Sequence, residues 1–458
     1  EIVAGLTTFM TMAYIIALNP NLLTGFGAQG GSQLWNGVFL ATCIASAIGT
    51  LVMAFAANKP FAMAPGMGLN SFFAVVVANI VTMTGMSYLQ SFQTALCVIL
   101  IEGIVFIVLS VLKVREKIVE AIPLGIRLGI APAIGLMLLN IGIGSNAGVY
   151  SSDGGPFYVM RDFFGALTPS LAKANMGDGY PQMVLTVVTM FVGLFLIVLF
   201  AHKKIKGSVL LGMLCASGIY WAGEAIFLHT NPFAALKGAS FVPAFGDMAA
   251  TTLFKFDFAA LGEIGWFTVV TLVITFCIID MFDPIGTLVG TASRVGMVDR
   301  DGNMPRMREA LLADAVGTVT GACTGTSTVT TFVESASGVE AGGRTGLTAL
   351  VAGIMFLLTI FLAPLFVAIP YAATGPALIY VGFLMLKGFT EIDFTDYDES
   401  IGPCVMMMFT AFTGTITNGL GAGIIVHVLV KLVRGKAKEI HPIMYLLCAL
   451  MVLYFIVG

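Results

Sequence analysis

Long apolar stretches with almost no charged residues recur along the chain and limit the folds open to it. The stretches at 90–112 and 181–201 are each long enough to cross a bilayer as one helix, which takes about 20 apolar residues. Charged residues make up 10% of the 458 residues and apolar residues 58%, whereas a soluble domain has about a quarter charged residues. The sequence therefore predicts an all-α polytopic membrane protein surrounded by a lipid bilayer.

The composition also argues against several other classes of protein. A net charge of −3 leaves no basic surface for a nucleic acid, and the high apolar content excludes a disordered chain. The seven cysteines have no CxxC spacing, and the four histidines have no metal-ligand spacing. Since no HExxH motif is present either, we expect neither an enzyme nor a metal or organic cofactor.

The apolar stretches predict where the chain crosses the membrane. Nine clear spans lie at 2–19, 36–57, 90–112, 124–145, 181–201, 207–228, 265–290, 349–370 and 374–388. Thr-Gly-Thr and Asn-Gly breakers divide the next apolar stretch into two short helices, 401–413 and 418–433. With two weak segments, 61–80 and 325–341, the prediction is about fourteen elements. The stretch 443–457 predicts a further helix, which either spans the membrane or lies at its surface.

The positions of Lys and Arg predict the orientation. The long loops 146–180 and 230–261 contain few basic residues. Basic residues instead cluster at Lys113/Arg115/Lys117, Lys203/Lys204/Lys206, Arg294/Arg300/Arg306/Arg308 and Lys431/Arg434/Lys436/Lys438. Because basic loops stay on the cytoplasmic side, we expect a cytoplasmic N-terminus and a location in the plasma (inner) membrane. The acidic run at 391–399 is interpreted as a solvated cytoplasmic connection.

The two halves of the chain contain similar segments in the same order. Ile122-Pro123 and Ile369-Pro370 each open a stretch of small residues followed by an apolar run. Two elements before each Ile-Pro helix lies a segment interrupted by Gly, Pro, Ser or Thr, at 61–73 and 326–343. The orientation above makes the halves inverted relative to each other. Such a matched pair of interrupted segments indicates the substrate site of a secondary transporter, although a purely structural re-entrant loop is the alternative.

Three carboxyl groups fall inside hydrophobic segments. Asp280 and Asp283 lie in the run 265–290, and Glu334 lies in the second interrupted segment. A carboxylate at membrane depth is costly unless it is paired, hydrated or protonated, so all three are candidates for substrate binding or proton coupling. The alternative explanation for Asp283 is structural: it could cap the helix beside Pro284. Glu102 and Glu224 are each alone in a helix, and no role is assigned to them.

Other side chains near these acids suit a flat, polar ligand. Asn70 in the first interrupted segment offers a donor and an acceptor, as the counterpart of Glu334 in the second. Phe282 and Phe332 have aromatic faces, although ordinary packing is as good an explanation for each. Together these groups favour a small planar heterocycle with N–H donors. They do not suit an inorganic anion, which would call for Arg or Lys.

With these residues in view, the sequence resembles a known family. It is similar to the nucleobase:cation symporters of the nucleobase–ascorbate transporter superfamily, in the AzgA-like purine permease branch. The matching segments are 7–20, 64–73, 282–290 and 332–350. The resemblance implies fourteen transmembrane elements in two inverted seven-helix repeats, with short strands and half-helices at elements 3 and 10. Relatives of this fold often dimerise through the gate domain, so a homodimer is expected as an option.

The same resemblance implies two domains, each made from both halves of the chain. The core domain would comprise 1–113 and 262–368, and the gate domain 114–230 and 369–458. The core would carry the substrate past the gate in an elevator-like motion. The small residues of the Ile-Pro helices are expected to form the smooth sliding face; they are Gly125, Gly129 and Ala133 in one helix and Ala372, Gly375 and Ala377 in the other.

The resemblance also assigns residues. The family's eighth-element acid is followed three positions later by Gly, which selects Asp283 with Gly286 and leaves Asp280 secondary for proton coupling. Its tenth-element acid matches Glu334, which is followed by Ser335, also a candidate substrate contact. Its third-element Asn matches Asn70.

One position departs from a related group. Uracil permeases have a His one turn after the eighth-element acid, where this sequence has Thr287. A histidine relay is therefore not expected, and proton coupling would fall to the carboxyl groups.

The resulting prediction is a proton-coupled importer of adenine, guanine or hypoxanthine, with sodium the less favoured ion. An anion exchanger of the sulfate-transporter architecture and a channel are the alternatives. The sequence does not indicate which purine is preferred.

Overall fold

The computed structural model describes residues 1–25, 29–112, 121–145, 179–233, 236, 240–294, 297 and 304–457. On helix α13 (Trp266–Arg294), the side chains of Phe282 and Asp283 and the burial of Gly286 lie outside this description. So do the basic residues 113–117 and most of the loop 146–180 that served to predict the orientation.

The protein is an assembly of helices with one small pair of strands. Residues 2–228 contain α1 (Ile2–Met12), α2 (Tyr14–Leu23), α3 (Gly31–Val52), β1 (Met63–Pro65), α4 (Met67–Thr84), α5 (Tyr88–Val111), α7 (Leu124–Asn140), α10 (Tyr180–His202) and α11 (Ser208–Gly223). The later part contains α12 (Phe245–Thr251), α13, α14 (Met307–Thr324), β2 (Val329–Thr331), α15 (Ser335–Glu340), α16 (Gly346–Thr359), α17 (Ala363–Val367), α18 (Tyr371–Met385), α19 (Tyr397–Thr413), α20 (Ile416–Val433) and α21 (Pro442–Val457). Ten of the described helical stretches are long and apolar enough to cross a membrane, which confirms the multi-pass prediction.

Helix α14 is missing from the spans named from the sequence. It is rich in Ala, Gly and Thr, and it contains Asp314, so its hydropathy does not stand out. The small residues are explained by its position, because α14 packs closely against α3 and α5 and against strand β2. Close packing of this kind favours small side chains over long apolar ones.

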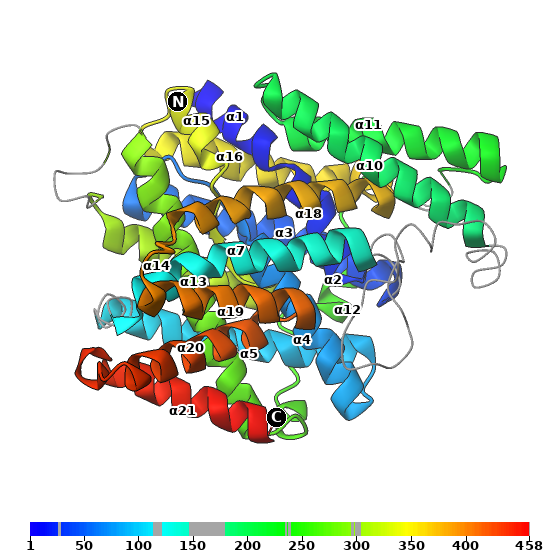
Figure 1. The fold of residues 1–458 in the computed structure, drawn as a ribbon. Helices are drawn as coiled ribbons and strands as arrows, with labels where there is room; N and C mark the ends of the chain where they lie inside the picture. The colour runs from blue at the N-terminus through cyan, green and yellow to red at the C-terminus, as the bar shows by residue number, and fades with distance from the viewer. Residues whose placement is uncertain are drawn as a thin grey trace.

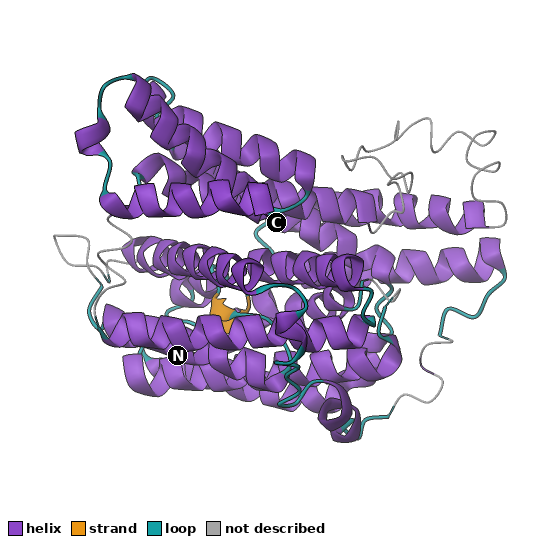
Figure 2. Ribbon diagram, turned by 90° about the horizontal axis from the view of Figure 1, so that it is seen from below, coloured by secondary structure: helices purple, strands orange, loops and turns teal. Residues whose placement is uncertain are grey.

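The two interrupted segments meet at the strand pair. β1 and β2 are antiparallel, with Met63 opposite Thr331 and Pro65 opposite Val329. β1 leads into α4 and β2 leads towards α15, as predicted for the short strands and half-helices. Figure 2 shows the strands inside the helical assembly, where their backbone groups are satisfied by each other and by neighbouring protein.

A tight turn returns the chain from α14 into β2. Gly325 ends α14 with φ of 105°, a left-handed conformation that glycine adopts without strain. The strand then runs back beside the helix so closely that a Cβ on Gly321 would lie 2.4 Å from the carbonyl oxygen of Ser327. Glycine at this position therefore lets the strand approach the helix backbone.

The helices pack in two sets. α3 packs on α14 and α16, α5 packs on α14, and α1 packs on α15 and α16. In the other set, α7 packs on α18 and α19, α10 packs on α11 and α18, and α20 packs on α19 and α21. In Figure 1, the α10–α11 pair and α21 lie at opposite edges of the molecule.

Two of the small residues expected on a sliding face, Gly125 and Gly129, pack against α19. A Cβ on Gly125 would come within 2.0 Å of the carbonyl oxygen of Glu399, and one on Gly129 would come within 2.5 Å of Pro403. Both contacts are with α19, within the second set of helices. The prediction that Gly125 and Gly129 form a sliding face was therefore wrong, because these glycines fasten α7 to α19.

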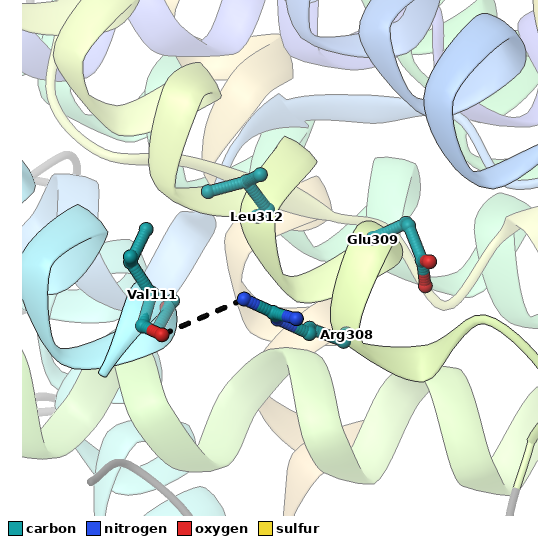
Figure 3. Close-up of a pocket in the computed structure, with 5 residues that line it drawn as sticks. Val111, Arg308, Glu309 and Leu312 are labelled. Atoms are coloured by element: carbon teal, nitrogen blue, oxygen red, sulfur yellow. Dashed lines mark hydrogen bonds between the residues drawn. The ribbon is translucent and has the colours of Figure 1, made fainter. Parts of the chain in front are cut away.

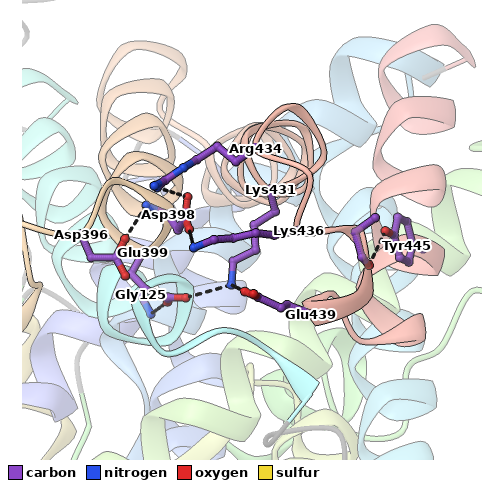
Figure 4. Close-up of polar contacts among 10 residues, drawn as sticks. Gly125, Asp396, Asp398, Glu399, Lys431, Arg434, Lys436, Glu439 and Tyr445 are labelled. Carbon is purple, nitrogen blue, oxygen red and sulfur yellow. Dashed lines mark hydrogen bonds and ion pairs between the residues drawn. The ribbon is translucent and has the colours of Figure 1, made fainter.

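Ion pairs and a hydrogen bond join the ends of α7, α19 and α20 (Figure 4). Asp398 of α19 is 2% exposed and pairs with Arg434 at 2.6 Å and with Lys436. The Glu399 carboxylate accepts a hydrogen bond from the Gly125 backbone N–H of α7 at 3.0 Å and lies 3.6 Å from Lys431 of α20. The hydrogen bond to Asp398 raises the pKa of the Lys436 ammonium above its ordinary value. The interpretation of the whole acidic run as a solvated connection was therefore wrong at Asp398.

Candidate functional site

Glu334 lies between strand β2 and helix α15 and faces the junction of α1 and α2. Its Oε1 accepts a hydrogen bond of 2.6 Å from the hydroxyl of Tyr14, which is 1% exposed. Its backbone carbonyl lies 3.4 Å from Thr11 Oγ1. The Glu334 side chain itself is half-buried. A hydrogen bond to an ionised carboxylate contributes about 1.5–3 kcal/mol, so Tyr14 holds the Glu334 carboxylate in one orientation.

The residues around Glu334 are hydrogen-bonded to the first interrupted segment (61–73). The Phe332 N–H donates to the Ala62 carbonyl at 3.1 Å, and the Ala62 N–H donates to Ser335 Oγ at 3.0 Å. Ser335 is fully buried and Phe332 is 5% exposed. The structure thus places both predicted residues beside Glu334, where Ser335 fastens the end of β2 to the start of β1.

Asn70 occupies the equivalent place after β1, in the first turn of α4. Its Nδ2 donates to the Pro65 carbonyl at 3.1 Å, and its Oδ1 accepts a hydrogen bond from the Ser327 hydroxyl. Asn70 is fully buried. Its amide therefore links the end of β1 to the residues just before β2, at the opposite end of the strand pair from Glu334.

The predicted residues of α13 are described only in part. Asp283 and Phe282 have side chains outside the description, so their part in the site stays a prediction. Thr287 is half-buried on the same helix. Asp280 is fully buried, and its Oδ2 accepts a hydrogen bond from Thr318 of α14 at 3.3 Å.

Behind β2 the structure gathers three buried carboxyl groups. Glu102, Asp280 and Asp314 come from α5, α13 and α14, and all are fully buried. Asp314 Oδ1 accepts hydrogen bonds from the Thr331 backbone N–H and from Thr330 Oγ1, both at 3.0 Å. Glu102 Oε2 accepts one from Thr328 Oγ1 at 3.2 Å.

Sequence reasoning left Glu102 unassigned and did not consider Asp314 or Tyr14. A signal was present in the threonine-rich run 324–331, whose hydroxyls act as the donors to these carboxyl groups. The residues that meet here lie far apart in the chain, so their spacing alone did not bring them together.

Comparison with known proteins identifies the family to which this chain belongs. The model of a family described as a permease family matches residues 1–420. The guanine/hypoxanthine permease PbuO of Bacillus subtilis is 35% identical over 459 residues, covering all of this chain and 96% of PbuO. The adenine permease AdeP of Escherichia coli is 32% identical over 455 residues, covering 99% of this chain and 92% of AdeP.

The chain belongs to the permease family. The resemblance recognised from the motifs is thereby confirmed, and the relatives' names assign the protein to transporters rather than enzymes.

Among solved structures, the transmembrane domain of a cyanobacterial bicarbonate transporter, BicA, is similar to the permease with a TM-score of 0.63. The identity is 16%, and the match covers 94% of the permease and 95% of that chain. The overall structure of SLC26A9 is similar with a TM-score of 0.59 and 12% identity, covering 94% of the permease and 65% of that chain. At these identities the likeness shows the fold alone.

One pocket of the permease lies away from these residues. It is formed by the end of α5 and the start of α14, and Figure 3 shows Arg308 Nη2 reaching the Val111 carbonyl across it at 3.5 Å. Its lining residues are Ser110, Val111, Arg308, Glu309 and Leu312. Since none of the candidate residues lines it, this pocket plays no part in the site.

Proposed function

We propose that the permease is a secondary active transporter that imports purine nucleobases together with protons. The observation that carries the proposal is Glu334, a carboxylate fixed by Tyr14 beside the crossing of the two interrupted segments, in a chain that matches purine permeases along its whole length. Paired interrupted segments near mid-membrane form the binding sites of many transporters. No nucleic acid, metal or organic cofactor enters the proposal.

The chemistry of Glu334 fits a purine. Its carboxylate accepts hydrogen bonds only, and purines present ring N–H and, in adenine and guanine, exocyclic amino donors. The binding set would include Asp283 and Asn70, with Phe332 and Phe282 providing apolar faces, Ser335 at the edge of the site and Thr287 as a secondary contact. Asp283, Glu334 and Asp280 are the proposed groups for proton coupling.

We infer an elevator-like mechanism in which a core domain (1–113 and 262–368) moves past a gate domain (114–230 and 369–458). The two packing sets of helices support this division, since α1, α3, α5, α14 and α16 contact one another and α7, α10, α18, α19 and α20 do likewise. The fourteen elements in two inverted repeats, a cytoplasmic N-terminus, the plasma (inner) membrane and a homodimer are parts of the same proposal.

Anion exchange is the alternative, and proteins that share this fold include a bicarbonate transporter and an anion transporter. An anion site would require positive charge. Among the described residues, the side chain that hydrogen-bonds Glu334 is the neutral Tyr14. A carboxylate at the crossing repels an anion, so a nucleobase fits the site better.

The test is uptake of radiolabelled adenine, guanine and hypoxanthine into proteoliposomes. An inward proton gradient should drive accumulation of at least one purine, and a sodium gradient at constant pH should not. Labelled bicarbonate and sulfate in parallel vesicles test anion exchange. Passive equilibration without accumulation would indicate a channel, and failure to take up any purine would overturn the proposal.

A further inference from the structure

We propose that the pocket between the end of α5 and the start of α14 binds the headgroup of a phosphatidylethanolamine, a lipid with one phosphate and one primary ammonium group. One basic and one acidic side chain line this pocket, together with a hydroxyl group and two apolar residues; they are Arg308, Glu309, Ser110, Val111 and Leu312. None of them belongs to the proposed purine site. The lipid site is therefore additional to that site and does not depend on which substrate the permease carries.

The two charged side chains of the pocket are not paired with each other. Arg308 and Glu309 are both exposed, and neither takes part in an ion pair within the described part of the chain. Figure 3 shows the guanidinium extended towards the Val111 carbonyl, 3.5 Å away, with the Glu309 carboxylate on the opposite side of Arg308. A small group that satisfies both must carry a negative and a positive charge.

The basic end of the pocket suits a phosphate group. Ser110 is 8% exposed, and its Oγ has no hydrogen-bond partner among the described residues, so its hydroxyl is available to a ligand. No side chain caps the start of α14, and the N-terminus of a helix attracts phosphate. Arginine binds phosphate oxygens through charge-assisted hydrogen bonds, and a carboxylate such as that of Glu309 accepts them from a primary ammonium.

The depth of the pocket in the membrane also fits a headgroup. Helix α5 has 24 residues. At 1.5 Å per residue it is about 36 Å long, whereas the hydrocarbon core of a bilayer is about 30 Å thick. The last turn of α5, which includes Ser110 and Val111, therefore reaches the headgroup layer.

An exposed apolar stripe on α5 leads to the pocket. Ile104, Val108 and Val111 are 50%, 48% and 52% exposed, and their spacing of four and then three residues places them on one face of the helix. An acyl chain along this stripe would bring its headgroup to Arg308. The stripe therefore favours a lipid over a soluble ester with the same polar groups.

The test compares three lipids with identical acyl chains on the purified, delipidated permease. Native mass spectrometry and thermal melting should show that phosphatidylethanolamine binds about 10-fold more tightly than phosphatidylcholine, which has no N–H donor, or phosphatidylglycerol, which has no positive charge. Equal affinity for the three lipids would overturn the proposal. Water-soluble glycerophosphoethanolamine should have no effect at the same concentration. Stabilisation by this ester equal to that by the lipid would overturn the assignment to a lipid.

Variants test the pocket itself. Arg308→Gln should weaken phosphatidylethanolamine and phosphatidylglycerol alike, by about 10-fold, because both lose the partner of their phosphate. Glu309→Gln should weaken only phosphatidylethanolamine and should strengthen phosphatidylglycerol, since a repelling carboxylate is removed. Arg306→Gln is the matched control, because this exposed arginine precedes the same helix but does not line the pocket.

A wild-type lipid preference that survives both Arg308→Gln and Glu309→Gln would place the lipid elsewhere and overturn the site. Loss of the preference in Arg306→Gln as well would show a general effect of charge and would overturn the specific pocket. The ranking of the three lipids on the wild type is decisive even if a variant does not fold.

Discussion

Gly135 of α7 and Gly382 of α18 meet backbone to backbone in a reciprocal contact. A Cβ on Gly135 would lie 2.7 Å from the Gly382 carbonyl oxygen, and one on Gly382 would lie 2.8 Å from the Gly135 carbonyl oxygen. Each glycine is twelve positions after the proline of its Ile-Pro pair. Equivalent positions of two related helices meet in this way across a two-fold axis, which supports the proposed inverted repeats.

Alanine at either glycine should destabilise the protein. The atom that a new methyl group would meet is a backbone carbonyl oxygen, which a side-chain rotation does not move away, so we expect a loss of about 1–3 kcal/mol. Thermal melting of the purified variants in detergent measures the effect. Gly218→Ala on α11 is the matched control, because a Cβ there meets nothing within 4 Å. Equal melting temperatures for Gly382→Ala and the control would contradict the tight contact.

Removing the charge of Glu334 should severely weaken purine uptake. Glu334→Gln replaces part of the acceptor set by a donor, so purine N–H groups lose their partner at a cost of about 1–3 kcal/mol, or 5- to 150-fold in affinity. Tyr14→Phe leaves the charge but frees the carboxylate from its 2.6 Å hydrogen bond, and a smaller loss is expected. Equilibrium binding of labelled purine to purified protein provides the measurement. Near-normal affinity in Glu334→Gln would exclude it as a substrate ligand.

The two acids of α13 should differ in their effects. Asp283→Asn is expected to reduce purine uptake more than Asp280→Asn, because Asp280 is fully buried and its carboxylate accepts a hydrogen bond from Thr318 of α14. Initial uptake rates across a range of external pH values distinguish them. Asp283→Asn should also flatten the pH dependence of whatever transport remains. The reverse ranking would place Asp280 in the substrate site.

A disulfide between α4 and α7 should stop transport by joining the proposed core to the proposed gate. A Cβ on Gly68 would lie 2.6 Å from Ile134 Cγ2 and 3.5 Å from its Cγ1, so the paired positions are within reach of a disulfide once Ile134 is shortened. The Gly68→Cys/Ile134→Cys protein should bind purine but not transport it when oxidised, and should recover transport when reduced. Each single cysteine variant, treated with the same oxidant, is the control. Undiminished uptake by fully crosslinked protein would rule out the sliding motion.

Local chemistry made part of this architecture predictable. Gly, Pro, Ser and Thr in 61–73 and 326–343 interrupt otherwise apolar sequence, and these interruptions became the two strands. Glu334 was visible because a carboxylate stands out in a hydrophobic segment. Which neighbour a side chain packs against was not predictable in this way, because that neighbour lies far away in the sequence. Gly125 was assigned to a moving surface although it packs on α19, and Glu102 was left unassigned although Thr328 donates a hydrogen bond to it.

The pairing of β1 with β2 is made by the main chain, with further backbone hydrogen bonds from Gly66 to Thr328 and from Phe332 to Ala62. Main-chain hydrogen bonds do not depend on which side chains the strands carry. Side chains at the ends of the strands are therefore free to diverge while the crossing itself persists. Relatives with different ligands can retain one scaffold in this way, and redesign of substrate preference should begin at the residues that follow each strand rather than within the strands.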